Sequence, residues 1–162
     1  MIEVEIAVVR LDPEAMAPII ILKEKEGKSK RFLPIVIGIF EAIAIVTELE
    51  KHEVVRPMTH DLMKSIIDNL GAEVVSILVS DLKDDTFYAE INLQLSDESV
   101  IKIDSRPSDA IALGIRAKAP IYVSEKVMVG SGISQDMMDP SSEDQLKLIL
   151  DALKPEDFGD KV

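Results

Sequence analysis

The chain has 162 residues, 47% of them hydrophobic, which is enough for one compact domain with its own core. Its 30 acidic and 18 basic residues give a formal net charge of -12 at pH 7, and a surface of that sign repels a nucleic-acid backbone at long range. The chain contains no cysteine, which excludes a disulfide scaffold, a thiolate metal site and a thiol nucleophile.

The start of the chain does not have the pattern of an export signal, so we expect a cytoplasmic protein. The most apolar stretch, residues 35–46, is shorter than the roughly 20 residues that cross a bilayer, and it contains Glu41. We therefore expect it to lie in the protein core and not in a membrane. Scarce Asn and Gln together with abundant Glu hint at a thermophilic source.

The first third of the chain predicts three strands followed by a helix. Residues 3–10 alternate polar and apolar side chains and are rich in Val and Ile, as in a half-buried strand. A turn at Pro13 precedes a second strand over 17–24, and residues 31–37 are apolar on both faces, which predicts a third strand. From 39 to 49 the apolar residues recur at helical spacing.

A connecting helix is predicted over residues 59–70. Thr59 can cap its free amides, Asp61 falls in the first turn where the helix dipole favours an anion, and Gly71 ends it. Its apolar residues lie on one face, so we expect this helix to cover a sheet.

The pattern then restarts, with strands predicted over 73–80, 86–95 and 100–103 and a helix over 107–118. The second unit therefore repeats the order of the first. In the best local match, the segment that begins at Glu41 aligns with the segment that begins at Asp109. This match suggests a duplication, and the alternative is convergence of two amphipathic helices.

We expect one main domain over residues 1–125, in which repeat units of about 1–51 and 73–118 are joined by the connecting helix. Residues 126–162 are expected to form a C-terminal extension with a short helix near 143–153 and a frayed end.

Polar residues crowd the junction between the last predicted strand and its helix. Pro107 suits a first helical turn, Ser108 and Asp109 can satisfy free amides, and Arg106 can pair with a nearby carboxylate, which together give a complete structural explanation. The functional alternative is that Asp104 and Asp109 project into one cleft. Two carboxylates there could hold a divalent cation or share acid and base roles.

Three further residues are candidates for chemistry. His60 can act as a base near neutral pH and Asp61 beside it could bind a metal, although a histidine in a first helical turn is usually only exposed. Glu41 lies among Ile and Ala residues and has three open alternatives: it faces solvent, it pairs with an arginine such as Arg56 or Arg106, or it adds a third carboxylate to a shared cleft.

Several of these motifs together resemble the bifunctional nuclease family. The similar segments are residues 33–38 with Glu41 and Ala42, residues 56–62, residues 104–113 and residues 155–158. They span nearly the whole chain, and their order and spacing are more specific than any one of them alone.

The resemblance implies an α+β fold with a mixed, mainly antiparallel sheet, a nuclease activity on RNA and DNA, and a homodimer. The apolar run 19–22 is compatible with an extra buried interface. The polar residues of the similar motifs become the positions to test, and they are Glu41, His60, Asp61, Asp104, Arg106 and Asp109.

Two hypotheses follow. In the first, Asp104 and Asp109 with Asp61 or Glu41 hold Mg²⁺ or Mn²⁺, the metal activates water, Arg106 stabilises charge on the phosphoryl group, and His60 serves as a base. In the second, the protein is a non-catalytic regulatory or interaction module, and the same residues cap helices and tie the two units together.

Overall fold

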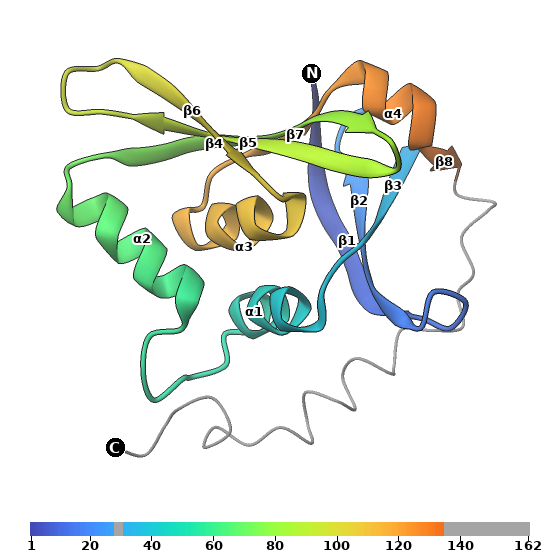
Figure 1. Cartoon of the computed structure of the whole chain (residues 1–162), viewed down its shortest axis with the longest axis horizontal. Coiled ribbons are helices and arrows are strands. Elements are labelled where there is room, and N and C mark those ends of the chain that lie inside the picture. The colour runs from blue at the N-terminus through green and yellow to red at the C-terminus, as the bar shows by residue number, and fades with distance from the viewer. Residues whose placement is uncertain (28–30, 135–162) are drawn as a thin grey trace.

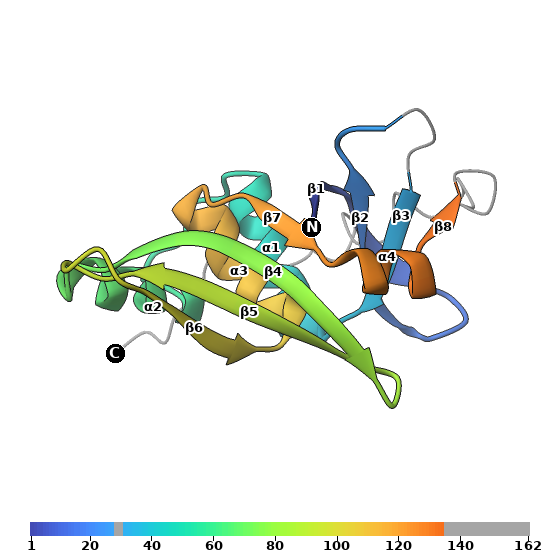
Figure 2. The same cartoon turned by 90° about the horizontal axis from the view of Figure 1, so that it is seen from above.

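The computed structural model describes residues 1–27 and 31–134. These residues form one eight-stranded sheet with four helices. In Figure 1 the helices α1, α2 and α3 lie below β4, β5 and β6 and to the left of β1, β2 and β3, whereas α4 lies at the upper right, on the other side of the sheet. The same arrangement seen from above shows that the sheet is strongly curved, so that its two halves enclose α1 and α3 (Figure 2).

The first half of the sheet is an antiparallel meander of β1 (Ile2–Asp12), β2 (Ala17–Glu24) and β3 (Arg31–Val36), followed by α1 (Ile39–Leu49). The pairing of β1 with β2 shifts register between residues 6 and 8. Such an irregularity bends a strand and increases its local twist, which suits the curvature of this half.

The second half begins with α2 (Thr59–Asn69) and continues with β4 (Glu73–Lys83), β5 (Thr86–Gln94) and β6 (Val100–Ser105). These three strands form a second antiparallel meander. The helix α3 (Pro107–Ala117) follows. A proline at its first position is favourable because the fixed φ of proline matches the helix and its missing amide would be unpaired there in any case.

A short strand, β7 (Ile121–Val123), joins the halves: it runs antiparallel to β1 and parallel to β4. After it, α4 (Glu125–Ser131) leads to β8 (Ile133–Ser134), which pairs with β3. The sheet order is therefore β6-β5-β4-β7-β1-β2-β3-β8. One parallel pairing in an otherwise antiparallel sheet confirms the predicted α+β fold class.

The order strand, strand, strand, helix occurs in both halves, as the sequence predicts. The common origin of the two halves stays a hypothesis, since similar order can also arise from convergence. The short helix expected near 143–153 lies outside the described residues.

One hydrophobic cluster fills the space between the sheet and the helices. The helix α3 is its centre, because residues 110–113 have no exposed surface. Gly114 lets α3 approach the sheet closely: a Cβ atom at this position would lie 2.6 Å from Cγ1 of Ile77 on β4. This close contact places α3 directly against β4.

Two expectations are corrected by the fold. The apolar run 19–22 does not offer an extra interface, because all four residues are at most 8% exposed and are covered by the chain itself. Thr59 is the first residue of α2 and not its cap. The preceding residue, Met58, takes that place, and its amide donates to the carboxylate of Asp61 at 2.8 Å.

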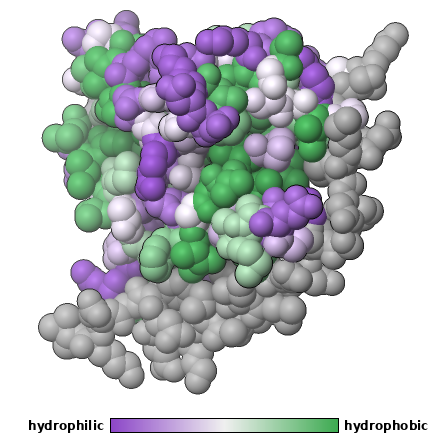
Figure 3. All heavy atoms as spheres, turned by 45° about the vertical axis from the view of Figure 1, so that its right-hand side comes forward, coloured by the Kyte–Doolittle hydropathy of each residue, from purple (hydrophilic) through white to green (hydrophobic). Residues whose placement is uncertain are grey.

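The surface is mixed in character. On the face drawn in Figure 3, hydrophilic side chains gather in the upper part and hydrophobic side chains reach the surface below them. Among the described residues, no helix is both long and apolar enough to cross a membrane.

Candidate functional site

Arg106 joins the start of α3 to α1. It is the residue before α3, and its Nε donates to Oδ2 of Asp109 at 2.6 Å while its Nη2 donates to Oε1 of Glu41 at 2.6 Å. Asp109 lies in the first turn of α3 and Glu41 in the first turn of α1, where the free amides of a helix favour an anion. The prediction that Arg106 pairs with a nearby carboxylate is confirmed, as is its pairing with Glu41 among the three alternatives left open for that residue.

His60 adds a third helix to this group. From the first turn of α2, its Nε2 lies 3.1 Å from Oδ1 of Asp109, so the two oxygens of Asp109 have different partners. The side chain of His60 is 7% exposed, and that of Asp109 is 24% exposed. His60 therefore lies behind Asp109 as seen from solvent. We call the four residues Glu41, His60, Arg106 and Asp109 the candidate site.

A second arginine organises the helices beneath the candidate site. Arg116 on α3 has a side chain that is only 5% exposed, and its Nε donates to Oδ1 of Asp61 at 2.5 Å. Its two other nitrogens donate to main-chain carbonyls, Ala112 at 2.8 Å and Ala44 at 3.1 Å. This buried cation thus has a carboxylate from α2 and a carbonyl from α1, as a buried charge requires.

The electrostatic effects follow these contacts. Hydrogen bonds from Arg106 to Asp109 and then to Glu41 raise the pKa of Arg106 above its ordinary value. For Asp61, burial alone would raise the pKa, but the hydrogen bond from Arg116, the amide of Met58 and the nearby positive charges together lower it. Asp61 is therefore a firmly ionised partner of Arg116 at neutral pH.

The chemistry open to the candidate site is set by Arg106. Its side chain is 66% exposed, so the guanidinium can meet a ligand without a change of fold. A planar guanidinium offers donors in a fork that matches two phosphate oxygens. The carboxylate of Asp109, held on one side by His60, can accept a proton.

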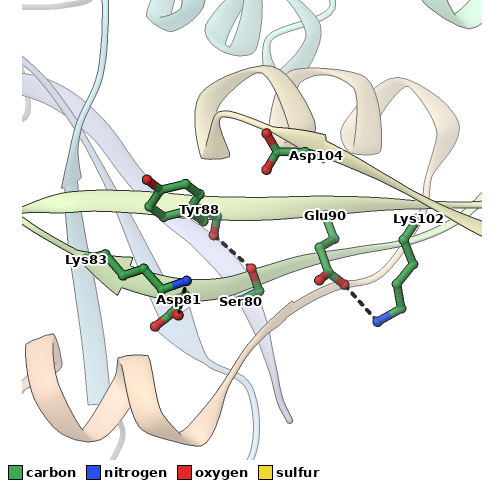
Figure 4. Close-up of a pocket in the computed structure, with 7 residues that line it drawn as sticks. All are labelled: Ser80, Asp81, Lys83, Tyr88, Glu90, Lys102 and Asp104. Atoms are coloured by element: carbon green, nitrogen blue, oxygen red, sulfur yellow. Dashed lines mark hydrogen bonds and ion pairs between the residues drawn. The ribbon is translucent and has the colours of Figure 1, made fainter.

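Asp104 belongs to a different part of the molecule. It lines a pocket of about 510 Å³ over β4, β5 and β6 (Figure 4), whose lining residues are Ser80, Asp81, Lys83, Tyr88, Glu90, Lys102 and Asp104. Its direct cross-strand partner is Glu90. The neighbours of Glu90 along β5, Ala89 and Ile91, point into the core, so Asp104 and Glu90 point to the opposite face of the sheet.

Lysines hold two of the acids in this pocket. Lys102 contacts Glu90 at 2.9 Å and Lys83 contacts Asp81 at 3.1 Å (Figure 4). Hydrogen bonds from Lys126 and then from Lys83 lower the pKa of Asp81 to about 2.

The shared cleft expected for Asp104 and Asp109 is not formed, because alternate side chains of β6 point to opposite faces of the sheet and α3 packs on only one of them. Of the four proposed metal ligands, Glu41 and Asp109 share one arginine, Asp61 holds another, and Asp104 stands apart. Within residues 1–27 and 31–134, no group of three or more His, Asp or Glu side chains is arranged to hold a metal ion.

Sequence reasoning missed two residues of this region. Arg116 was not singled out, although an arginine that directly follows the apolar run 110–115 of a helix signals a buried charge that needs a partner. Phe40, next to Glu41, was read only as part of an apolar helix, yet it is 80% exposed. Helical spacing of its neighbours could have placed it on the outer face of α1.

Comparison with known proteins gives matches over most of the chain. Residues 20–136 match the bifunctional nuclease domain. An uncharacterised protein of Mycobacterium tuberculosis is 35% identical over 165 residues, an alignment that covers 96% of this chain and 97% of that protein.

Plant proteins that are named as bifunctional nucleases have a lower sequence identity to this chain. Bifunctional nuclease 1 of Oryza sativa subsp. indica is 28% identical, over 83% of this chain and 41% of its own length. Bifunctional nuclease 2 of Oryza sativa subsp. japonica is 30% identical, over 74% of this chain and 37% of its own length. The chain therefore spans less than half of these relatives. With most of its length matched to the domain, the chain belongs to the bifunctional nuclease domain family.

Proposed function

We propose that the protein is a nuclease that hydrolyses phosphodiester bonds of RNA and DNA at the candidate site. The reaction class is supported by membership of the bifunctional nuclease domain family and by plant relatives that carry the nuclease name. The location is supported by one observation above all: an exposed arginine is held between carboxylates of two helices, and one of these, Asp109, also contacts the buried His60.

Arg106 is the proposed phosphate-binding residue. Its guanidinium is held in place by Glu41 and Asp109, so it is oriented before a ligand arrives. A phosphodiester that approaches from solvent replaces one of these carboxylates as the hydrogen-bond partner of Arg106. The arginine then stabilises the negative charge that builds up on the phosphoryl oxygens in the transition state.

Asp109 is the proposed proton acceptor, and His60 its positioning residue. When Arg106 turns to the phosphate, Asp109 keeps its contact with His60 and gains a free oxygen. Water attacks phosphorus and its proton passes to Asp109. The bond from phosphorus to the leaving oxygen breaks, and that oxygen takes a proton from solvent.

Phe40 is a proposed contact for a nucleic-acid base. It precedes Glu41 on α1 and is 80% exposed, which is unusual for so large an apolar side chain. An exposed aromatic ring one residue from Glu41, the partner of the proposed phosphate-binding arginine, offers a stacking surface that tolerates any base. This combination suits a nuclease that acts on both RNA and DNA.

A divalent metal at Glu41, Asp61, Asp104 and Asp109 does not fit this arrangement. Two of these carboxylates are neutralised by Arg106, one by Arg116, and Asp104 points to the other face of the sheet. Oxygen ligands of Mg²⁺ or Mn²⁺ need to converge on one point. We therefore assign the proposed chemistry to the side chains alone.

The same contacts favour a second candidate function, a non-catalytic module. Glu41, Asp109 and Asp61 all neutralise arginines, and the two arginines tie α1, α2 and α3 together. In a non-catalytic module, these ion pairs would serve only to stabilise the fold. The two candidates differ in whether Arg106 and Asp109 are needed for cleavage.

The test compares Asp109→Asn with Asp104→Asn in purified full-length protein on labelled single-stranded RNA and DNA. We expect Asp109→Asn to lower the cleavage rate about a hundredfold or more, as for loss of a proton acceptor. Asp104→Asn should stay close to the wild-type rate, because this carboxylate lines the pocket over β4, β5 and β6 and is not part of the candidate site.

Each variant is assayed with Mg²⁺, with Mn²⁺ and with a chelator, and its fold is checked by circular dichroism. Equal losses in the two variants would contradict the proposed location. A wild-type protein without cleavage under all three conditions would leave the non-catalytic function as the better account.

A further inference from the structure

The strand β6 forms an exposed edge of the sheet. It is the last strand in the sheet order, and its pairing partner in the described part of the chain is β5 alone. An edge strand presents unpaired amides and carbonyls along one side, which can add a strand from another chain.

The side chains of β6 are unusual for an edge that stays in water. Ile101 and Ile103 are 40% and 41% exposed, and they point to the face of the sheet that carries the helices, because their partners on β5 are core residues. The helix α2 lies on the same side of the sheet (Figure 1), and Leu62 and Ile66 of α2 and Leu70 just after it are exposed at helical spacing. Apolar side chains that gather at a free edge indicate a contact surface.

The two charged residues of β6 make this strand complementary to itself. Lys102 and Asp104 flank Ile103 and point to the open face of the sheet. If two copies of β6 pair antiparallel with Ile103 opposite Ile103, Lys102 of each copy lies opposite Asp104 of the other. A two-fold axis through Ile103 therefore creates two pairs of opposite charge.

Other registers that keep the same faces together are less favourable. A shift that centres the axis on Lys102 places two lysines opposite each other, and a shift that centres it on Asp104 places two carboxylates opposite each other. Like charges directly across a strand pair are destabilising. The sequence of β6 thus selects one register.

We propose that β6 is a homodimer interface, in which a second copy of this chain pairs antiparallel with residues 101–105 in the register centred on Ile103. The two sheets then form one continuous sheet, and the helix-bearing faces of both copies meet beside the strand pair. The exposed isoleucines of β6 are covered in this arrangement.

The absence of cysteine from the chain allows a direct test of the register. The variant Ile103→Cys places two thiols opposite each other across the two-fold axis, within the Cα separation that a disulfide accepts. The matched variant Ile101→Cys places each thiol opposite Ser105 of the other copy. Under mild oxidation, we expect a cross-linked dimer for the first variant and little for the second.

A charge-exchange series tests the affinity of the full-length chain by sedimentation equilibrium. We expect Lys102→Asp and Asp104→Lys to weaken the dimer about tenfold each, and the double exchange to restore it, because only the double variant has opposite charges across the axis again. Lys126→Asp, which removes an equally exposed lysine on α4, should leave the dimer unchanged.

Three results would overturn the proposal. The wild-type chain could be a monomer at all concentrations, which would exclude any interface between two copies. The dimer could keep its affinity in both single variants, which would place the interface elsewhere. Finally, Ile101→Cys could cross-link as readily as Ile103→Cys, which would contradict the register.

Discussion

At the scale of single residues, two arginines pair with different carboxylates in different surroundings. Arg106 is exposed and shared by Glu41 and Asp109, whereas Arg116 is buried and fixed by Asp61 and two carbonyls. Exposure suits exchange with a ligand, and burial suits a structural tie. The two residues are therefore assigned different roles, although both pair with acids.

Asp61 gives a prediction for acid stability. Its pKa is lowered in the folded protein, so its contribution to the free energy of unfolding is present above the unfolded value of about 4 and is lost as the pH falls through the folded value. Asp61→Asn should be less stable than wild type at neutral pH, because Arg116 loses its charged partner. Between pH 6 and 3 the variant should lose less stability than wild type.

The measurement is urea unfolding at a series of pH values, followed by circular dichroism. If both proteins lose the same free energy of unfolding over this interval, the ion pair between Asp61 and Arg116 does not carry the proposed stabilisation.

At the scale of elements, Arg116 holds three helices together beneath the candidate site. Arg116→Met replaces the guanidinium with an unbranched apolar side chain and leaves Asp61 without its cation. We expect a loss of about 2 kcal/mol in the free energy of unfolding, below the range for a fully buried pair because Asp61 is 28% exposed.

Lys64→Met is the matched control, since Lys64 forms an exposed ion pair with Asp68 within α2. It should change the free energy of unfolding by less than about 0.5 kcal/mol. The same urea titration measures both variants, and a loss for Lys64→Met as large as that for Arg116→Met would contradict the role of Arg116 as a tie.

Most helices and strands could be predicted from the sequence because their hydrophobic residues recur with a clear period. The alternation in residues 3–10 and the helical spacing in 39–49 gave strand and helix correctly, since burial of one face enforces both periods. The short strand β7 and the helix α4 were not predicted. Segments of three and seven residues are too short to show a period, and their structure depends on pairing with distant strands.

The candidate site was predictable in part. Its residue types and the pairing of Arg106 with an acid follow from a helix start that is rich in charged residues. The separation of Asp104 from Asp109 could not be predicted, because it depends on which face of β6 carries α3. If β6 were shifted by one residue relative to β5, Asp104 would point to the face that carries α3.

At the scale of the whole molecule, the net charge of -12 opposes binding of any nucleic acid. One guanidinium between two carboxylates does not reverse this locally. In the proposed function, a nucleic-acid substrate is therefore held by specific contacts with Arg106 and Phe40 and not by long-range attraction. This explains why a substitution at one residue is expected to have a large effect.

The decisive measurement compares cleavage by Arg106→Gln with cleavage by Arg31→Gln. Arg31 is a matched control, because it also bridges two carboxylates, Glu24 and Glu125, at a distance from the candidate site. Both variants remove one positive charge and two ion pairs. We predict that Arg106→Gln lowers the rate about a hundredfold on RNA and DNA while Arg31→Gln retains wild-type activity. Equal rates in the two variants would contradict the central claim that Arg106 binds the phosphate.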